Sequence, residues 1–279
     1  MIRAFAKVNL ALQVEPRNSD GFHPLRGLFQ SISLCDDVEL EASEEDEIVI
    51  AGGWAPHDES NLAWRALQRV REETDRLTPM RLSITKRIPA EAGLGGASAD
   101  AAVALVAASR LLGATFDAVR TIGPDLGSDV PFALVGGTAI VAGRGELVSP
   151  RPSLHGFAFA LVVPPAELST ADVYRAWDEL DEPRGPEVKA TRLPPPLRDY
   201  APLRNDLYPA AVALAPAVEE WRAELAARWD VPVMMTGSGS CLFGMFPTLE
   251  EAAGAVDGVP AGVRFAEAAS PVDQGWEEA

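Results

Sequence analysis

The sequence is poor in cysteine and histidine. Its 279 residues include two cysteines, Cys35 and Cys241, which lie far apart and lack the spacing of a redox pair or a thiolate metal site. We therefore expect no disulfide framework, and this cysteine usage fits a reducing compartment. The three histidines, His23, His57 and His155, are scattered and have no carboxylates at ligand spacing, so we expect no dedicated zinc site.

Long hydrophobic runs and an excess of positive charge are also missing. No uncharged stretch approaches the roughly 18 residues of a membrane-spanning helix, and the opening MIRAFAKVNLALQV lacks the small-residue cleavage site of a signal peptide. We therefore expect a cytoplasmic protein without a membrane partner. With 24 Lys and Arg against 41 Asp and Glu, the formal net charge is -17, which disfavours binding to nucleic-acid backbones and acidic lipids. A small anionic ligand can still bind in a locally positive pocket.

Glycine and proline, at 23 residues each, separate segments that follow strand or helix patterns. Period-two alternation predicts strands, and apolar spacing of three and four predicts amphipathic helices. In the first half we expect strands in the opening segment, over 28–40, 47–50 and 80–88 and in GGTAIVAG, and helices over 61–77, 97–112 and 116–126. This order lacks the regular alternation of a doubly wound parallel sheet, so we assign the chain to the α+β class.

A composition break at SPRPSLHG, residues 149–156, is the expected boundary between two lobes, 1–152 and 153–279. The second lobe shows the order strand, helix, helix, strand, strand, helix, strand, which suits an antiparallel sheet with helices on one face. Its expected elements are a strand in FAFALVV, helices over 171–180, 210–229 and 249–256, strands on either side of TGSGS and a strand near 263. The segment 181–206, rich in proline and charge, is expected to be a surface loop.

The stretch EAGLGGASADAA, residues 91–102, places three glycines at a strand-to-helix junction. Glycine lets backbone N–H groups approach an anion closely, and a helix start adds positive potential, so the loop suits a phosphate. The alternative is a turn that requires positive φ. A Walker A motif is excluded because Ala97-Ser98-Ala99 stands where lysine followed by serine or threonine is required. A dinucleotide fingerprint is excluded because Ser98 replaces its last glycine.

Lys7 and Asn9 share one face of the first predicted strand, because side chains alternate with period two. A lysine in an otherwise apolar strand is costly to bury unpaired, so it favours a nearby anion. The alternative is a solvated strand face. The position of Asn9 beside it favours a site.

Two loop segments carry further candidate side chains. Asp129, in GSDVP, is either a helix N-cap or a carboxylate presented to a hydroxyl that loses its proton in phosphoryl transfer. In SDGFHPL, the Asp20-Gly21 turn places Phe22 and His23 on a loop, where they are either simply exposed or able to grip a planar base by stacking and hydrogen bonding.

A last segment, MMTGSGSCLF, places Gly237 and Gly239 between two predicted strands, as a tight hairpin that can also brace a ligand loop. Together, AKVNLAL, PAEAGLGGASADAA and TGSGSCLF resemble, in order and separation, the three motifs of the GHMP small-molecule kinases, the family of galactokinase, homoserine kinase and mevalonate kinase. The resemblance extends over nearly the whole chain.

This resemblance implies a two-lobed GHMP kinase fold: an N-terminal mixed α/β lobe, a C-terminal ferredoxin-like antiparallel sheet lobe with helices, and an active site in the cleft between them. AKVNL, DGFH followed by LF, LGSDVPF and RNDLYPA are similar to the branch that uses ATP and Mg2+ to phosphorylate a cytidine diphosphate conjugate of methylerythritol, on the non-mevalonate route to isoprenoids. Two alternatives stay open: a kinase of the same family for another small alcohol, such as homoserine or mevalonate, and a nucleotide-binding module without catalysis.

The resemblance also implies roles for residues of this chain. Asp129 is the expected base, and Lys7 its charge-stabilising partner near the accepting hydroxyl. The acceptor is expected to contact Asn9, Phe22, His23, Thr170 and Tyr174. The ATP phosphates are expected on the loop formed by Pro89, Ala90, Glu91, Ala92, Gly93, Leu94, Gly95, Gly96, Ala97, Ser98 and Ala99.

Four residues depart from the family pattern. Phe22 stands where many members have tyrosine, Ala97 and Ala99 replace a glycine and a serine of the loop, and Glu91 brings a negative charge near the expected phosphates. Magnesium is expected to arrive with ATP, and Ser98 is the loop hydroxyl available to it.

Overall fold

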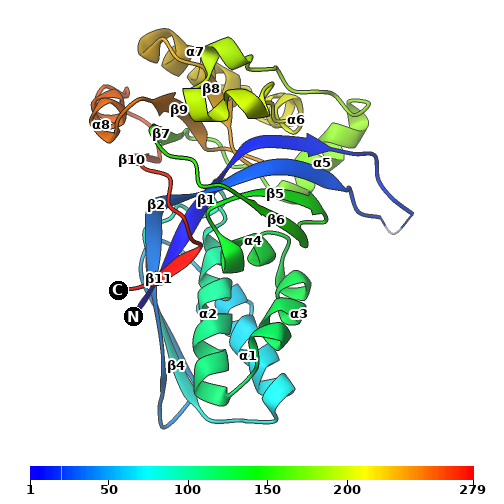
Figure 1. Ribbon diagram of the computed structural model, residues 1–279, viewed down its shortest axis with the longest axis vertical. Helices are drawn as coiled ribbons and strands as arrows, with labels where there is room; N and C mark the ends of the chain where they lie inside the picture. The colour runs from blue at the N-terminus through cyan, green and yellow to red at the C-terminus, as the bar shows by residue number, and fades with distance from the viewer. Residues whose placement is uncertain (20) are drawn as a thin grey trace.

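The computed structural model describes residues 1–19 and 21–279. Its first sheet follows the order β11-β1-β2-β4-β3, and β5 and β6 extend it from β2 (Figure 1). Its strands are β1 (Ile2–Val14), β2 (Leu25–Ala42), β3 (Glu47–Gly52), β4 (Met80–Lys86), β5 (Thr138–Gly143), β6 (Leu147–Arg151) and β11 (Trp276–Glu278). Strand β2 is long enough to pair with β5 through its first residues and with β4 through its last.

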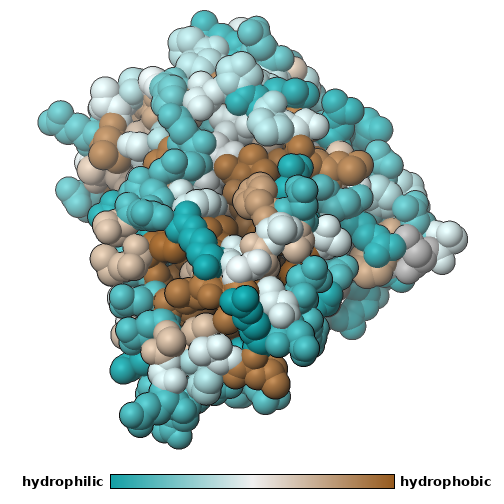
Figure 2. All heavy atoms as spheres, turned by 60° about the horizontal axis from the view of Figure 1, so that its bottom comes forward, coloured by the Kyte–Doolittle hydropathy of each residue, from teal (hydrophilic) through white to brown (hydrophobic). Residues whose placement is uncertain are grey.

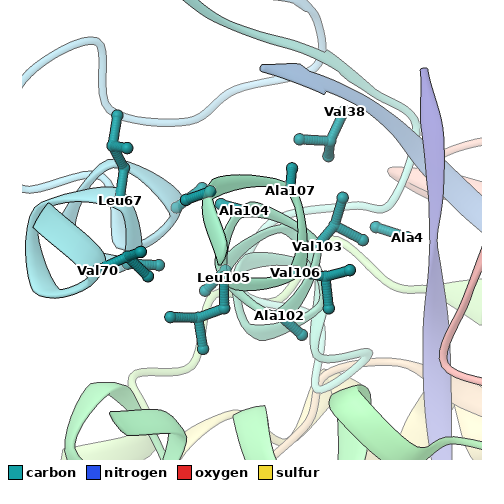
Figure 3. Packing of buried hydrophobic residues seen from close by; sticks show 14 of the residues in the cluster. Ala4, Val38, Leu67, Val70, Ala102, Val103, Ala104, Leu105, Val106 and Ala107 are labelled. Carbon is teal, nitrogen blue, oxygen red and sulfur yellow. The ribbon is translucent and has the colours of Figure 1, made fainter. Parts of the chain in front are cut away.

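Four helices accompany this sheet: α1 (Leu62–Thr74), α2 (Gly96–Leu112), α3 (Phe116–Leu126) and α4 (Val130–Val135). Helix α2 is rich in alanine and is buried from Ala99 to Ala108, which lets it lie close to the sheet on one side and to α1 on the other. Figure 3 shows the side chains of α2 between Leu67 and Val70 of α1 and Ala4 and Val38 of the sheet. The helix ends at Gly113, whose left-handed conformation glycine adopts without strain.

The second sheet is antiparallel with the order β10-β7-β9-β8. Its strands are β7 (Ala158–Val163), β8 (Val233–Met235), β9 (Leu242–Phe246) and β10 (Phe265–Ala269), and its helices are α5 (Thr170–Glu179), α6 (Tyr208–Leu214), α7 (Ala217–Trp229) and α8 (Leu249–Asp257). Alternate side chains of β7 bury on opposite faces. Ala160 and Val162 belong to the core beneath the helices, whereas Phe159 and Leu161 belong to a core shared with Val8 of β1. This shared core joins the two sheets.

The α+β class and the two-lobed arrangement are confirmed, and most predicted elements are present. The helix predicted over 210–229 is wrong as one element, because Pro216 separates α6 from α7. The segment 181–206 is more than a surface loop, since Leu193, Leu197 and Leu203 are buried in the core shared by the sheets. The sequence did not indicate β6 or β11. The boundary within 149–156 stays a prediction: β6 ends inside this segment at Arg151 and β7 begins just after it at Ala158, while β11 returns to the first sheet.

Figure 2 shows one face of the molecule, on which hydrophilic residues surround a band of hydrophobic ones. The excess of acidic residues fits this mostly hydrophilic surface.

Cys35 and Cys241 are both free, and burial raises the pKa of the Cys241 thiol to about 12, so this thiol stays protonated at neutral pH. In the part of the chain that the structure describes, no helix is long and apolar enough to cross a membrane.

Candidate active site

A cavity of about 540 Å³ lies between the two sheets and brings most of the predicted residues together. Its walls come from β1, the glycine loop, the start of α4, the start of α5 and the turn between β8 and β9. These segments are distant in sequence and meet because the two sheets pack through a common core. The cavity therefore combines residues of both halves of the chain.

Lys7 and Asp129 form an ion pair inside this cavity, with Lys7 Nζ 3.1 Å from Asp129 Oδ2. The ammonium group also donates a hydrogen bond of 2.7 Å to Asn9 Oδ1 and lies 5.4 Å from the centre of the Phe29 ring. Lys7 is 6% exposed, which excludes the solvated strand face as the reason for this lysine. Asp129 occupies the N-cap position of α4, but its side chain makes no capping hydrogen bond and reaches Lys7 instead.

The glycine loop opens α2 toward the cavity. Gly93 and Gly95 have φ values of 75° and 74°, a left-handed conformation that glycine tolerates. Glycine is also required by space: a Cβ on Gly93 would lie 2.3 Å from the Thr236 carbonyl oxygen, and one on Gly95 would lie 3.0 Å from Lys7 side-chain carbons. Gly95 caps α2 without a side chain, so the helix start presents bare N–H groups where an anion can approach.

All of the eleven predicted loop residues except Ala99 border the cavity. Ala99 is buried and its N–H is already bonded to Gly95 O. The loop is fixed on two sides, since Lys7 N–H donates to Leu94 O at 2.9 Å and Cys241 N–H donates to Ala92 O at 3.1 Å. A loop held by both sheets is pre-organised, which lowers the entropy lost when an anion binds.

Three of the five predicted acceptor residues, Asn9, Thr170 and Tyr174, border the cavity, whereas Phe22 and His23 do not. The Thr170 hydroxyl lies 2.8 Å from that of Ser238. Burial, with the charge of Asp129, raises the pKa of Tyr174 to about 12. His23 does not border the cavity but stacks on Tyr174, with ring centroids 5.3 Å apart.

Phe22 also lies outside the cavity lining, and it is 53% exposed. The guanidinium of Arg144, on the turn between β5 and β6, lies 4.0 Å from the centre of its ring. The Asp20 position of the predicted Asp20-Gly21 turn lies outside the described residues. Phe22 and His23 lie between β1 and β2, on the loop that the sequence predicted.

A second buried lysine, which sequence reasoning missed, also borders the cavity. Lys86 Nζ donates to Asp36 Oδ2 and, at 2.6 Å, to Asp100 Oδ2, and all three residues are buried. Its ammonium would lie 3.4 Å from a Cβ on Gly96, the first residue of α2. Period two places Lys86 on the buried face of β4 with Leu82 and Ile84, a signal that could have found it.

The protonation of this cluster follows from its composition of one ammonium and two carboxylates. Burial raises the pKa of Asp100 to about 7, although Lys86 opposes that shift. Burial alone would lower the pKa of Lys86, but Asp100 and Asp36 outweigh it and the net pKa is raised. Asp36 is further stabilised by the N–H groups of Arg87 and Ile88, whereas Asp100 Oδ1 has no hydrogen-bond partner among the described residues.

Sequence reasoning also missed the apolar end of the cavity, formed by Trp54, Ala55, Pro56 and Leu62. Trp54, Ala55 and Pro56 lie on the loop after β3, and Leu62 is the first residue of α1. Asn61 caps this helix by accepting a hydrogen bond from the Ala63 N–H. An apolar surface of this kind suits a planar base. In the ranges 1–19 and 21–279, no three histidine, cysteine or carboxylate side chains are grouped so that they could hold a metal ion.

Two family models match this chain: the GHMP kinase N-terminal domain over residues 61–137 and the GHMP kinase C-terminal domain over residues 191–263. With the relatives below, these matches show that the chain belongs to the GHMP kinase family. The resemblance found in the three sequence motifs is thereby confirmed.

The relatives carry one specific name within that family. The chain is 36% identical to the 4-diphosphocytidyl-2-C-methyl-D-erythritol kinase of Geobacillus kaustophilus, over 88% of this chain and 87% of that protein. It is 38% identical to the enzyme of the same name from Mycolicibacterium gilvum, over 87% and 80% of the two chains.

Solved structures agree with these relatives. A crystal structure of 4-(cytidine 5'-diphospho)-2C-methyl-D-erythritol kinase matches 97% of this chain and 99% of its own, with a TM-score of 0.80 and 33% identity. The homoserine kinase of Cytophaga hutchinsonii matches with a TM-score of 0.68 at 18% identity, over 99% and 96% of the two chains, a likeness of fold alone.

Proposed function

We propose that this chain transfers the γ-phosphoryl group of ATP to the 2-hydroxyl of 4-diphosphocytidyl-2-C-methyl-D-erythritol, a step of the non-mevalonate route to isoprenoids. The relatives that bear this kinase name support the proposal over about nine-tenths of the chain. The observation that carries it is the contact of 3.1 Å between Lys7 Nζ and Asp129 Oδ2, next to the glycine loop in one cavity. A base, a cation and a phosphate-binding helix start are the parts that phosphoryl transfer needs.

The start of α2 and the loop 89–99 are the proposed site of the ATP phosphates. Bare N–H groups at Gly95 and Gly96 and the positive end of a 17-residue helix offset phosphate charge without lysine. The exposed Glu91 has a positive φ and is the one carboxylate on this loop. The apolar end at Trp54 and Pro56 is the proposed site of the adenine.

Magnesium is proposed to enter with ATP. Mg2+ commonly binds to substrate phosphates with few protein ligands, which fits a cavity whose described residues hold no preformed group of metal ligands. The Ser98 hydroxyl borders the cavity beside the proposed phosphate site and is the side chain that would face the ion. When bound, Mg2+ would offset the charge of the phosphates.

The proposed chemistry joins the acceptor oxygen to the γ-phosphorus and breaks the bond from that phosphorus to the bridging oxygen, which releases ADP. The proton of the hydroxyl passes to Asp129, while Lys7 orients this carboxylate and offsets charge that develops on the acceptor oxygen. Because proton transfer occurs late in a loose transition state, Asp129 acts without being a strong base.

The acceptor is proposed to lie across Asn9 and Thr170 toward Tyr174. Its cytosine is assigned to Phe22, His23 and Tyr174, because His23 already stacks on Tyr174 and Phe22 is exposed on the same loop. Phe22 supplies a stacking face without the hydroxyl of a tyrosine.

ADP release with a panel of alcohols tests the proposed function. The panel contains the cytidine conjugate, homoserine and mevalonate, each with ATP and Mg2+. We expect ADP release with the cytidine conjugate, and competition by cytidine diphosphate against it. Release with homoserine or mevalonate, without such competition, would indicate another small-alcohol kinase, and no acceptor-dependent release would indicate a module without catalysis.

A further inference from the structure

Thr236 lies directly after β8 and is fully buried. Its hydroxyl is the meeting point of three segments. It accepts a hydrogen bond of 2.9 Å from the Asn9 N–H of β1, and it lies 3.1 Å from Asn9 Oδ1 and 3.2 Å from Gly93 O of the glycine loop. Thr236 itself does not border the cavity, so any effect on a substrate must act through these neighbours.

Asn9 is the neighbour that this hydroxyl contacts twice, at its backbone N–H and at its side-chain oxygen. Its side-chain oxygen accepts from Lys7 Nζ at 2.7 Å, and because an ammonium group only donates, this contact selects the oxygen over the amide nitrogen. The same oxygen lies 3.1 Å from the Thr236 hydroxyl, whose single proton has Asn9 Oδ1 and Gly93 O as its two acceptors. The amide nitrogen has no hydrogen-bond partner among residues 1–19 and 21–279, although Asn9 borders the cavity. With its oxygen held, Asn9 presents two free N–H donors to a ligand.

Lys7 is the next group in this network. Its ammonium is shared between Asn9 Oδ1 and Asp129 Oδ2, so the position of the Asn9 oxygen helps to fix where the cation meets the carboxylate. A hydrogen bond between a charged donor and a neutral acceptor is stronger than one between two neutral groups. Displacing the amide would therefore move Lys7 relative to Asp129.

We propose that Thr236 is a positioning residue for phosphoryl transfer: its hydroxyl, supplied by the second lobe, holds the Asn9 amide so that the oxygen meets Lys7 and the nitrogen faces the acceptor. This inference rests on the proposed function of the same cavity. Thr236 touches no substrate, and it couples β8 to the pair of Lys7 and Asp129 through Asn9.

Thr236→Val, which keeps the shape and removes the hydroxyl, tests the proposal. We expect kcat to fall about 100-fold, the scale of a misplacement of about 1 Å in an active site. Thr236→Ser retains the hydroxyl and is expected to restore most of the turnover. The dissociation constant of ADP, measured by calorimetry, is expected to change little in either variant.

A matched control exists at Thr138, a buried threonine away from the cavity. Its hydroxyl also accepts from a backbone N–H, that of Leu154, and donates to a side-chain amide oxygen, that of Gln30. Thr138→Val therefore makes the same chemical change, and we expect a lower Tm with kcat unchanged. If Thr138→Val lowered kcat as much as Thr236→Val, loss of folding would explain both.

A double-mutant cycle with Asn9→Ala separates positioning from general support. If Thr236 acts through the Asn9 side chain, Thr236→Val should lower kcat much less in the Asn9→Ala background than in the wild type. Effects that multiply would overturn the proposal. So would a Thr236→Val variant with normal kcat, or one that loses ADP affinity while turnover persists, because the hydroxyl would then serve Gly93.

Failure of the proposed function is a separate outcome. If the wild type phosphorylates no alcohol of the panel, the Asn9 side-chain amide is followed by 15N NMR, with its signals assigned from Asn9→Ala. We expect one ordered pair of amide signals in the wild type and in Thr236→Ser, and shifted or broadened signals in Thr236→Val. Unchanged signals in Thr236→Val would overturn the positioning role.

Discussion

The regions around Lys7 and Lys86 offer a comparison within one cavity. Both ammonium groups are buried, and both residues belong to strands of the first sheet. Lys7 meets one carboxylate, Asp129, whose side chain is 30% exposed, and the neutral amide of Asn9. Lys86 lies between Asp36 and Asp100, whose side chains are 0% and 4% exposed. The charges around Lys7 therefore nearly cancel, and a ligand can reach its carboxylate partner. The group around Lys86 is enclosed and has one carboxylate more than it has ammonium groups.

This difference indicates that a buried lysine beside the cavity need not act on a ligand that binds there. The number and the burial of its carboxylate partners decide how much of its charge remains for a ligand. Lys7 has a partner that a substrate can reach, which suits catalysis. The donors of Lys86 serve the carboxylates beneath the start of α2, which suits a role in holding strand, loop and helix together.

The largest effect is expected from Asp129→Asn, which removes the charge and keeps the shape. We expect kcat to fall about 100- to 10,000-fold, the usual contribution of a general base. Tm should change little because the side chain is partly exposed. Asp125→Asn is the control, since this carboxylate forms an exposed ion pair with Arg69. Near-normal turnover of Asp129→Asn, measured by ADP release, would show that Asp129 is not the general base.

The next effect is expected from Lys86→Met, measured as the free energy of unfolding in urea. Removing one partner of a buried ionic cluster costs about 3–5 kcal/mol, because Asp36 and Asp100 are left without their cation. Lys189→Met, at an exposed lysine, is the control. An unfolding free energy equal to that of the wild type would mean that the Lys86 cluster does not support the fold.

A smaller effect is expected from Lys7→Ala. Loss of the ion pair with Asp129 should lower kcat about 10- to 100-fold, while ATP binding weakens less. Tm should fall less than in Lys86→Met, because Lys7→Ala leaves a carboxylate that water can reach. Measuring kcat and the ATP dissociation constant together checks this. An unchanged rate of transfer would show that burial alone does not make Lys7 catalytic.

The elements that hold the glycine loop could be predicted from local signals. Alternation over β1 and glycine at the start and end of α2 are patterns within one segment, and both predicted the observed elements. The pairing of Lys7 with Asp129 could not be predicted from local signals, because 122 positions separate the two residues (129 minus 7). Only the resemblance to a kinase family indicated that they lie together.

Period two marks Lys86 as a buried lysine, but its partners could not be read from local patterns, since Asp36 lies on a different strand and meets Lys86 only after β2 pairs with β4. For the same reason β11 was missed: its three residues form a strand by pairing with residues 2–4 at the beginning of β1, which is remote in sequence. The break at Pro216 was within reach of sequence reasoning, because proline lacks the N–H that a helix interior requires.

The smallest effect is expected from Asp100→Asn and concerns the pH dependence of stability. The pKa of Asp100 is raised to about 7 in the folded protein from the usual aspartate value of 3.8, so folding is accompanied by uptake of a proton at pH values between these two. The stability from this proton is fully present below pH 3.8 and is lost as pH rises through about 7.

Asparagine at position 100 can still accept a hydrogen bond from Lys86 but does not titrate. The Tm of Asp100→Asn minus that of the wild type should therefore increase from pH 5 to pH 8, by about 2–4 °C for each kcal/mol. A difference that stays constant over this range would show that Lys86 neutralises Asp100 completely, and the two lysine regions would then differ less than their geometry indicates.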